Sequence, residues 1–471
     1  MDPVFGDFID RDEELAELSA LHKRPEGALV VLVGRRRVGK TALLREFMKG
    51  RSSIYFMATE ERDAENRSYF RNLVADFTGN ALVRAASALS WEDLFRLAVD
   101  AAEAKRDEGK LVLVIDEYQY LTVGNPAFSS LLQRVWDTLL KPAGCMLVLC
   151  GSYIGMMERE TLSYSSPLYG RRDALIRLQP IPFRLYPLFF PGREPTGLVP
   201  FYAVTGGVPR YIEAFRKETD IRRGISRVVL NRRGILYEEP YLLLEREVSE
   251  IGSYFSLLKT VAAGNHRLFA IAGRLEVPQT SLSRPVSTLL SLDILERVVP
   301  ITEEHPEHSK RSLYRIRDPF LRFWFRFVYP HRSALESGKT EEVEGHLDRE
   351  FISRHMAQLY EDICRQRLWD LSGEGGLGFP LTRVGSYWES DREIDVVGWS
   401  AERRILVACE CKYQSHPVGL RVLEDLITKV NAIQWRIPVE SRRYVLFSRS
   451  GFEASLLHKA ESDSSLLLEQ L

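Results

Sequence analysis

Residues 28–44 read ALVVLVGRRRVGKTALL, an apolar run that breaks at a segment rich in glycine and arginine and then resumes with helical spacing. This order predicts a buried strand, a tight loop and a helix. Glycines in such a loop let backbone N–H groups surround phosphate oxygens, and the following helix turns its positive end toward the same anion. The loop fits the pattern GxxxxGK(S/T) through Gly34, Arg35, Arg36, Arg37, Val38, Gly39, Lys40 and Thr41.

We therefore expect the loop to bind ATP or GTP. Lys40 is expected to reach the β- and γ-phosphates, and Thr41 to place its hydroxyl on a Mg²⁺ ion that bridges them. The alternative is a surface turn rich in glycine and arginine, but this alternative does not explain the buried-strand run from Leu29 to Val33 that precedes it.

Length and composition set the outer bounds. A chain of 471 residues is too long for one core and predicts about three domains. Its net charge of −1 shows no overall basic excess, which leaves room for a local basic groove. The amino terminus lacks the features of a signal peptide and no apolar run is long enough to span a membrane, so we expect a cytoplasmic protein. The five cysteines form no CxxC pair and are expected to be reduced core residues.

A second apolar run, residues 111–115, ends in Asp116 and Glu117. In a parallel sheet such a strand delivers its last side chains to the edge where ligands bind. Asp116 is expected to join the Mg²⁺ shell, and Glu117 to orient or deprotonate the attacking water.

Two further positions follow along the chain. A third buried strand, within residues 145–153, places Ser152 at its tip, where it could sense the γ-phosphate or simply cap a helix. Arg171 and Arg172 lie in a loop ahead of another strand. An arginine there can stabilise developing phosphate charge, in its own subunit or in a neighbouring one, although adjacent surface arginines are more often solvated.

Five motifs in this order, GRRRVGKT, VLVIDEYQYL, GSYIGMM, SPLYGRR and TGGVPRYI, resemble the archaeal-type ATPases of the STAND branch of AAA+ proteins. The resemblance covers about the first half of the chain. It implies a P-loop core with a parallel sheet, followed by a helical lid whose Gly207-Val208-Pro209 segment contacts the nucleotide region. It further implies that Ser152 is the first sensor, Arg171 the arginine finger and Arg210 a second sensor.

Residues 252–317 have the element order of a winged helix-turn-helix, with short helices followed by two strand-like runs. Pro285 is tolerated in the recognition helix only in its first turn. The module either contacts DNA or couples domains, and an aromatic helix at residues 318–330 reads as interdomain core. Its candidate phosphate contacts are Arg274, Ser281, Ser283 and Arg284.

The last part of the chain carries a second constellation. Alternation along the strand RILVACECKYQ puts Glu410 and Lys412 on one face. With Asp395 on the neighbouring strand and Glu361 on the preceding helix, these residues can hold one or two Mg²⁺ or Mn²⁺ ions, and Lys412 can position a water for attack on a phosphodiester. Glu393 competes with Asp395 as the candidate metal ligand of this strand, because alternation puts both side chains on the same face.

The order of a helix with Glu361, then Asp395, then Glu410-x-Lys412 resembles the PD-(D/E)xK nuclease fold, although no proline precedes Asp395. This end of the chain also resembles the uncharacterised domain that often follows archaeal-type ATPases. The resemblance implies a DNA-directed, metal-dependent domain, and an intact constellation does not by itself show cleavage.

The sequence thus predicts an α/β protein: a P-loop NTPase core (residues 1–190), a helical lid (191–250), a winged helix-turn-helix with its aromatic helix (251–332) and a restriction-endonuclease-like domain (333–471). We expect an ATP-hydrolysing switch or motor coupled to a DNA-binding, nuclease-like domain. The alternative is a signalling or scaffolding ATPase whose last domain binds nucleic acid or protein without cleavage. Expected partners are ATP, DNA and either a second copy of the chain or another protein.

Overall fold

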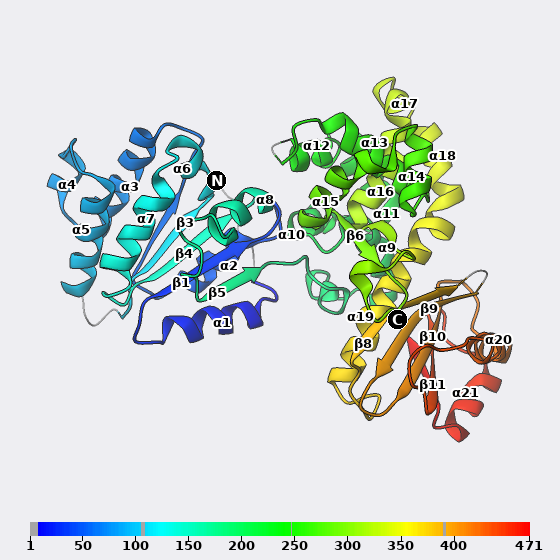
Figure 1. Ribbon diagram of the computed structural model, residues 1–471. Helices are drawn as coiled ribbons and strands as arrows, with labels where there is room; N and C mark the ends of the chain where they lie inside the picture. Colours follow the sequence, from blue (N-terminus) through cyan, green and yellow to red (C-terminus); the bar gives the residue numbers. More distant parts are fainter. Residues whose placement is uncertain (1–7, 105–108, 246, 390–391) are drawn as a thin grey trace. The chain divides into compact units, whose positions relative to one another are not determined.

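The structure is a computed structural model that describes residues 8–104, 109–245, 247–389 and 392–471. The chain forms two compact units (Figure 1). The first comprises Met1–Pro180, Val208–Arg210 and Leu242–Ser249, and the second comprises Ile181–Gly207, Tyr211–Tyr241 and Glu250–Leu471. None of the described helices is long and apolar enough to cross a membrane. The predicted division into four domains stays a prediction.

The first unit is built on a parallel sheet with the strand order β2-β3-β4-β1-β5. Every residue of β1, β3 and β4 is buried, because helices cover both faces of the sheet. Since all strand pairs are parallel, their carboxyl ends meet at one edge. The strands are β1 (Ala28–Val33), β2 (Ser53–Met57), β3 (Val112–Asp116), β4 (Met146–Gly151) and β5 (Ala174–Arg177).

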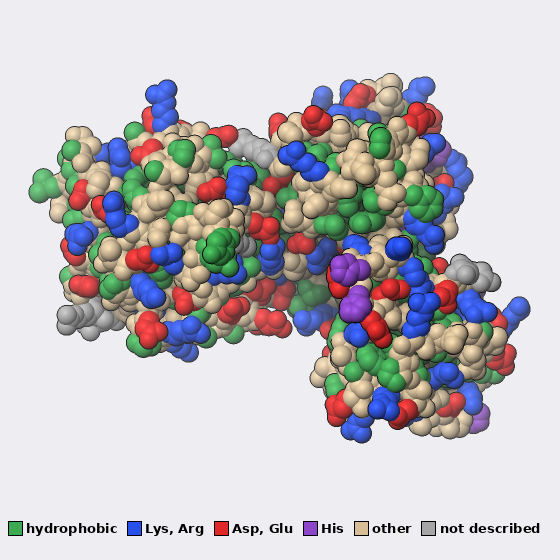
Figure 2. All heavy atoms as spheres, in the orientation of Figure 1, with side chains coloured by type: hydrophobic (Ala, Val, Ile, Leu, Met, Phe, Trp, Pro, Cys, Tyr) green, Lys and Arg blue, Asp and Glu red, His purple; other side chains and the backbone are tan. Residues whose placement is uncertain are grey.

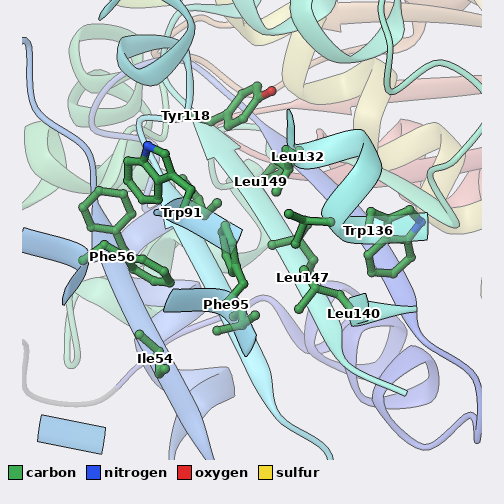
Figure 3. Close-up of a cluster of buried hydrophobic side chains, with 14 of the residues drawn as sticks. Ile54, Phe56, Trp91, Phe95, Tyr118, Leu132, Trp136, Leu140, Leu147 and Leu149 are labelled. Carbon is green, nitrogen blue, oxygen red and sulfur yellow. The ribbon is translucent and has the colours of Figure 1, made fainter. Parts of the chain in front are cut away.

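The helices of this unit divide between the two faces of the sheet. The apolar sides of α1 and α2 pack on one face through Leu18, Leu21, Leu43 and Phe47. On the other face, α3, α5 and α7 build an aromatic core around Phe56, Trp91 and Phe95, together with Leu132 and Leu147 (Figure 3). The helices are α1 (Asp12–His22), α2 (Lys40–Met48), α3 (Asp63–Thr78), α4 (Ala81–Ala85), α5 (Trp91–Ala104), α6 (Gln119–Gly124), α7 (Phe128–Val135) and α8 (Ile154–Met157).

The second unit begins with short helices. Trp324, in the aromatic helical stretch, donates its indole N–H to the carbonyl of Tyr237 at 2.9 Å, and α16 packs against α9. The aromatic stretch predicted at residues 318–330 is therefore buried core. Its helices are α9 (Pro195–Thr205), α10 (Pro209–Phe215), α11 (Ile221–Ile225), α12 (Glu239–Leu244), α16 (Pro319–Phe323) and α17 (Arg332–Glu336).

Between α12 and α16 the chain forms further helices and then an antiparallel pair of strands. Pro285 is the third residue of α15, in the turn whose backbone N–H groups have no partner within the helix, so it leaves the helix intact. The elements are α13 (Ile251–Ala262), α14 (Leu268–Leu275), α15 (Ser283–Ser291), β6 (Leu295–Val298) and β7 (Leu313–Ile316).

The carboxyl-terminal part folds around a mixed sheet in the order β12-β11-β10-β9-β8. Strands β8, β9 and β10 pair antiparallel, and β10, β11 and β12 pair parallel. The elements are α18 (Thr340–Glu350), α19 (Ala357–Gly373), β8 (Arg383–Glu389), β9 (Arg392–Ser400), β10 (Ile405–Lys412), α20 (Leu420–Asn431), β11 (Ser441–Ser448), α21 (Ala454–Ser462) and β12 (Leu466–Gln470).

Helices cover both faces of this second sheet. Leu423 and Leu426 of α20 pack in one core with Leu406 of β10, and strand alternation puts Glu410 on that same face. Cys411 points to the other face, where its thiol meets that of Cys364 on α19. All five cysteines are free, as expected. On the face displayed in Figure 2, basic and acidic side chains are interspersed, in keeping with the net charge of −1.

Candidate functional site

The loop between β1 and α2 depends on its two glycines. A Cβ atom at Gly34 would lie 2.9 Å from the carbonyl oxygen of Leu178. Gly39, which precedes α2, has φ 102°, a left-handed conformation that strains other residues. The loop backbone therefore needs glycine at both positions of the pattern.

Lys40 lies inside this loop and is 5% exposed. Its ammonium donates to the carbonyl oxygens of Gly34 at 2.6 Å and Arg35 at 3.1 Å, and to the hydroxyl of Ser152 at 2.9 Å. The predicted phosphate-binding lysine thus connects the residues that follow two neighbouring strands, Gly34 after β1 and Ser152 after β4.

Thr41 and Asp116 lie side by side at the carboxyl edge of the sheet. The Thr41 hydroxyl donates to Oδ2 of Asp116 at 3.1 Å, and the backbone N–H of Glu117 donates to Oδ1 at 3.0 Å. Tyr55 on β2 also donates its hydroxyl to Oδ2, and burial together with this carboxylate raises the pKa of the Tyr55 phenol. A hydroxyl and a buried carboxylate in contact are oxygen donors that suit Mg²⁺.

The Glu117 carboxylate is held in place on several sides. Oε1 accepts the Ser152 hydroxyl at 2.8 Å, and Oε2 accepts the Ser152 backbone N–H at 3.2 Å and the side-chain amide of Gln119 at 2.5 Å. Glu117 itself has φ 54°, a left-handed conformation that is uncommon for a residue with a side chain. Three predicted residues, Lys40, Glu117 and Ser152, therefore form one connected group.

Other predicted residues of the loop have structural partners nearby. Arg36 donates to the hydroxyl of Tyr153, and its guanidinium lies 4.9 Å from the centre of that ring. The carbonyl of Val38 accepts from Arg11. The Pro209 ring stands 3.7 Å from the point where a Cβ atom on Gly39 would be, so this proline lies against the loop, and Arg210 follows it in α10. That the segment contacts a nucleotide stays a prediction.

Sequence reasoning missed Arg11, Tyr55 and Gln119. Arg11 is 6% exposed and donates to the carbonyls of Val38 at 3.2 Å and Gln179 at 2.7 Å, and burial lowers its pKa. It therefore braces the phosphate loop from the start of α1. The acidic segment around Arg11 indicates a helix start, and no short pattern in the sequence marks the arginine as a partner of the loop.

Arg171 lies at the opposite end of the sheet from the loop. The next residue but one, Asp173, exchanges hydrogen bonds with Leu29 near the start of β1, whereas the loop follows the end of β1. The Arg171 guanidinium is held by Asp137, at 3.0 Å to each carboxylate oxygen. Arg171 thus does not meet the loop of its own chain, and its role as an arginine finger for a neighbouring copy stays a prediction.

The second constellation gathers at the end of β10. The ammonium of Lys412 lies 2.7 Å from Oε1 of Glu410, and Lys429 of α20 lies 3.3 Å from Oε2. Oδ2 of Asp395 accepts the backbone N–H of Cys411 at 2.8 Å. Burial, with the nearby Glu410 carboxylate, raises the pKa of Asp395 to about 6. A cavity of about 340 Å³ beside Glu410 is lined further by Lys412, Val422, Asp425, Thr428 and Lys429.

Glu361 approaches this group from α19. Burial raises its pKa to about 8, and the Asp395 carboxylate adds to the shift. Among the residues that the structure describes, no group of three or more histidine, cysteine, aspartate or glutamate side chains is arranged to hold a metal ion. Lysines pair with both oxygens of Glu410, and Cys364 of α19 meets Cys411 on the face of β10 opposite Glu410. The metal set of Glu361, Asp395 and Glu410 stays a prediction.

Comparison with known proteins identifies the first unit as part of an ATPase domain. Residues 8–215 match the model of an ATPase domain predominantly from Archaea, and residues 324–424 match DUF234, described as archaea bacterial proteins of unknown function. A Walker-type ATPase of Pyrococcus abyssi has the same fold over 68% of this chain and 96% of its own, with a TM-score of 0.53 and 22% identity.

Two proteins of Methanocaldococcus jannaschii are similar in sequence. An uncharacterized ATP-binding protein is 40% identical over 52 residues, which cover 10% of this chain and 88% of that protein. An uncharacterized protein is 30% identical over 413 residues, which cover 86% of this chain and 88% of the relative. The chain therefore belongs to the family of archaeal-type ATPases that carry a DUF234 region in their carboxyl-terminal part.

Proposed function

We propose that this chain is an ATP-hydrolysing switch in which Lys40, Ser152 and Glu117 read and act on the γ-phosphate. The observation that carries the proposal is their unbroken set of contacts, in which Ser152 touches both the Lys40 ammonium and the Glu117 carboxylate. In this assignment Lys40 binds the β- and γ-phosphates and Glu117 orients the attacking water. Thr41 and Asp116 hold Mg²⁺, which neutralises phosphate charge when bound.

Steady-state ATP hydrolysis in Mg²⁺ tests this assignment. Lys40→Ala should abolish nucleotide binding and hydrolysis, and Asp116→Asn should lower the affinity for Mg²⁺-ATP. Lys49→Ala is a matched control, because Lys49 directly follows α2 on the surface, where it pairs with Glu46. An active Lys40→Ala protein would overturn the assignment.

For the carboxyl-terminal domain we propose a DNA-directed, nuclease-like role. Support comes from the order of the elements, with Glu361 on α19, Asp395 on β9, and Glu410 and Lys412 on β10. Asp395 and Glu410 supply carboxylate oxygens of the kind that Mg²⁺ and Mn²⁺ accept, and Glu361 is a third donor on the neighbouring helix. The order α13, α14, α15, β6, β7 supports the winged helix-turn-helix prediction as the DNA-binding element.

Cleavage assays separate this role from its rival. Wild-type protein with Mg²⁺ or Mn²⁺ should cut DNA, while Asp395→Ala and Lys412→Ala should not. Asp425→Ala changes a carboxylate that lines the same cavity but belongs to no predicted ligand set, so it serves as the control.

A second candidate function is a signalling or scaffolding ATPase whose last domain binds nucleic acid without cutting it. Two observations favour it: both oxygens of Glu410 are paired with lysines, and the described carboxylates form no three-ligand metal group. DNA binding that weakens steeply with salt, without cleavage in either metal, would select this function.

A further inference from the structure

A segment distant in sequence completes the first unit. Leu242–Ser249 belongs to this unit although the chain on either side of it belongs to the second. Leu244 is fully buried and Val248 is 9% exposed, so both anchor the segment. Of its residues, Arg246 lies outside the described part of the chain.

The segment contacts the phosphate loop through Arg36. One guanidinium nitrogen of Arg36 donates to the Leu242 carbonyl at 3.5 Å, a long hydrogen bond, while another donates to the Tyr153 hydroxyl. Arg36 therefore joins the loop, the residue after Ser152 and this segment.

A second contact is made by Glu247. Its carboxylate accepts the backbone N–H groups of Ile154 and Gly155, which follow Ser152 and Tyr153 directly. Burial raises the pKa of Glu247 to about 7, with Glu158 adding to the shift and Arg159 and the two N–H groups opposing it. Burying the Glu247 carboxylate costs free energy, and its interactions with the N–H groups of Ile154 and Gly155 offset part of that cost. These interactions fix the backbone of the turn that follows Ser152.

We infer that Glu247 is a positioning residue for ATP hydrolysis, which holds the Ser152 backbone and hydroxyl against the Glu117 carboxylate. The inference rests on the proposed roles of Ser152 and Glu117. Without Glu247, two N–H groups lose their acceptor and the turn after Ser152 loosens, so the Glu117 carboxylate samples more orientations. The Lys40 contacts with Gly34 and Arg35 stay intact, and nucleotide binding is preserved.

The expected loss of ATP hydrolysis follows from misplacement of the Glu117 carboxylate. A catalytic group displaced by about 1 Å can cost on the order of 100-fold in rate. We expect Glu247→Ala to lower kcat by about 10-fold to 100-fold, with KM for ATP changed by less than about twofold. Glu247→Gln retains one acceptor oxygen and should lie between this variant and the wild type.

A pH profile distinguishes positioning from a general structural role. Only the ionised Glu247 accepts both N–H groups well, so wild-type kcat should rise through about pH 7, and Glu247→Gln should lack that inflection. Glu245→Gln is the matched control, since Glu245 is an exposed glutamate of the same segment, and it should behave as wild type.

The experiment measures kcat, KM and thermal unfolding for wild type, Glu247→Ala, Glu247→Gln, Glu245→Gln and Lys40→Ala. A wild-type kcat in Glu247→Ala, or an inflection retained in Glu247→Gln, would overturn the inference while leaving the proposed function in place. A wild-type chain without ATPase activity, or an active Lys40→Ala protein, would overturn the proposed function itself. If Glu247→Ala does not fold, kcat and the pH profile of Glu247→Gln decide the matter.

Discussion

Ser152, just after the end of β4, donates its hydroxyl to Oε1 of Glu117, just after the end of β3, at 2.8 Å. Its backbone N–H donates to the other oxygen of the same carboxylate at 3.2 Å. Both contacts arise because β3 and β4 are parallel neighbours whose carboxyl ends meet at one edge. Two donors from one residue thereby fix the orientation of the carboxylate, as the proposed water-orienting role requires.

The first prediction concerns Glu117 itself. Glu117→Gln keeps the size of the side chain but removes its charge, so kcat for ATP hydrolysis should fall by about 100-fold or more while ATP binding is retained. Steady-state hydrolysis and equilibrium binding of a nucleotide measure the two quantities separately. Glu65→Gln changes an exposed glutamate of α3 and should leave both unchanged. Equal losses of binding and hydrolysis would contradict the assigned role.

The second prediction concerns Arg171, which lies at the end of the sheet remote from its own phosphate loop. If a neighbouring copy receives this arginine, the ATPase rate per subunit should rise with protein concentration. A mixture of Lys40→Ala and Arg171→Ala should then be more active than either variant alone, because an intact loop meets an intact arginine in some interfaces. Activity that is independent of concentration and not restored by mixing would show that Arg171 serves only its ion pair with Asp137.

Local patterns in the sequence predicted much of the ATP site. Lys40 and Thr41 follow from the loop, and Asp116 from the strand that ends in it. Tyr55 was missed because its contact with Asp116 depends on the register of β2 against β3, which pairs Met57 with Asp116. Such a register is set by the whole sheet, so no short pattern carries it.

The same limit applies to Arg171 and Glu361. The loop position of Arg171 was predicted, but its distance from the phosphate loop depends on the register of β5, whose first residue, Ala174, pairs with Val30 of β1. Glu361 was correctly placed on a helix before the strands, yet which face of the sheet that helix covers is a property of the packed fold. Sequence spacing predicts neighbours along an element better than neighbours across a sheet.

The third prediction concerns Gly207, which lies in the turn between α9 and α10. Gly207 has φ 74°, and a Cβ atom there would lie 2.0 Å from the carbonyl oxygen of Ile181. Gly207→Ala should therefore lower the free energy of unfolding by at least about 2 kcal/mol. Gly252→Ala is the control, since Gly252 lies in α13 with open space around it and should change stability by less than about 1 kcal/mol. Denaturant unfolding of both variants measures the difference, and equal stabilities would contradict the clash.

The fourth prediction concerns acid stability and His266. Its Nδ1 carries the hydrogen that is donated to the Tyr314 carbonyl at 3.1 Å, and burial lowers its pKa to about 4. The unfolded chain protonates this histidine near pH 6.5, well before the folded chain does, so the stabilisation is complete above that pH and is lost as the pH falls from about 6.5 to about 4.

Between pH 7 and pH 5, His266 should account for a loss of about 2 kcal/mol in the free energy of unfolding. His266→Gln removes the titrating group, so this variant is less stable at pH 7 but loses less on acidification. His355, whose pKa burial lowers to about 3, adds a loss of the same sign to both proteins, so the measured quantity is the difference between their pH dependences. Urea unfolding at the two pH values provides it. Parallel losses in wild type and His266→Gln would mean that His266 titrates alike in the folded and unfolded chains.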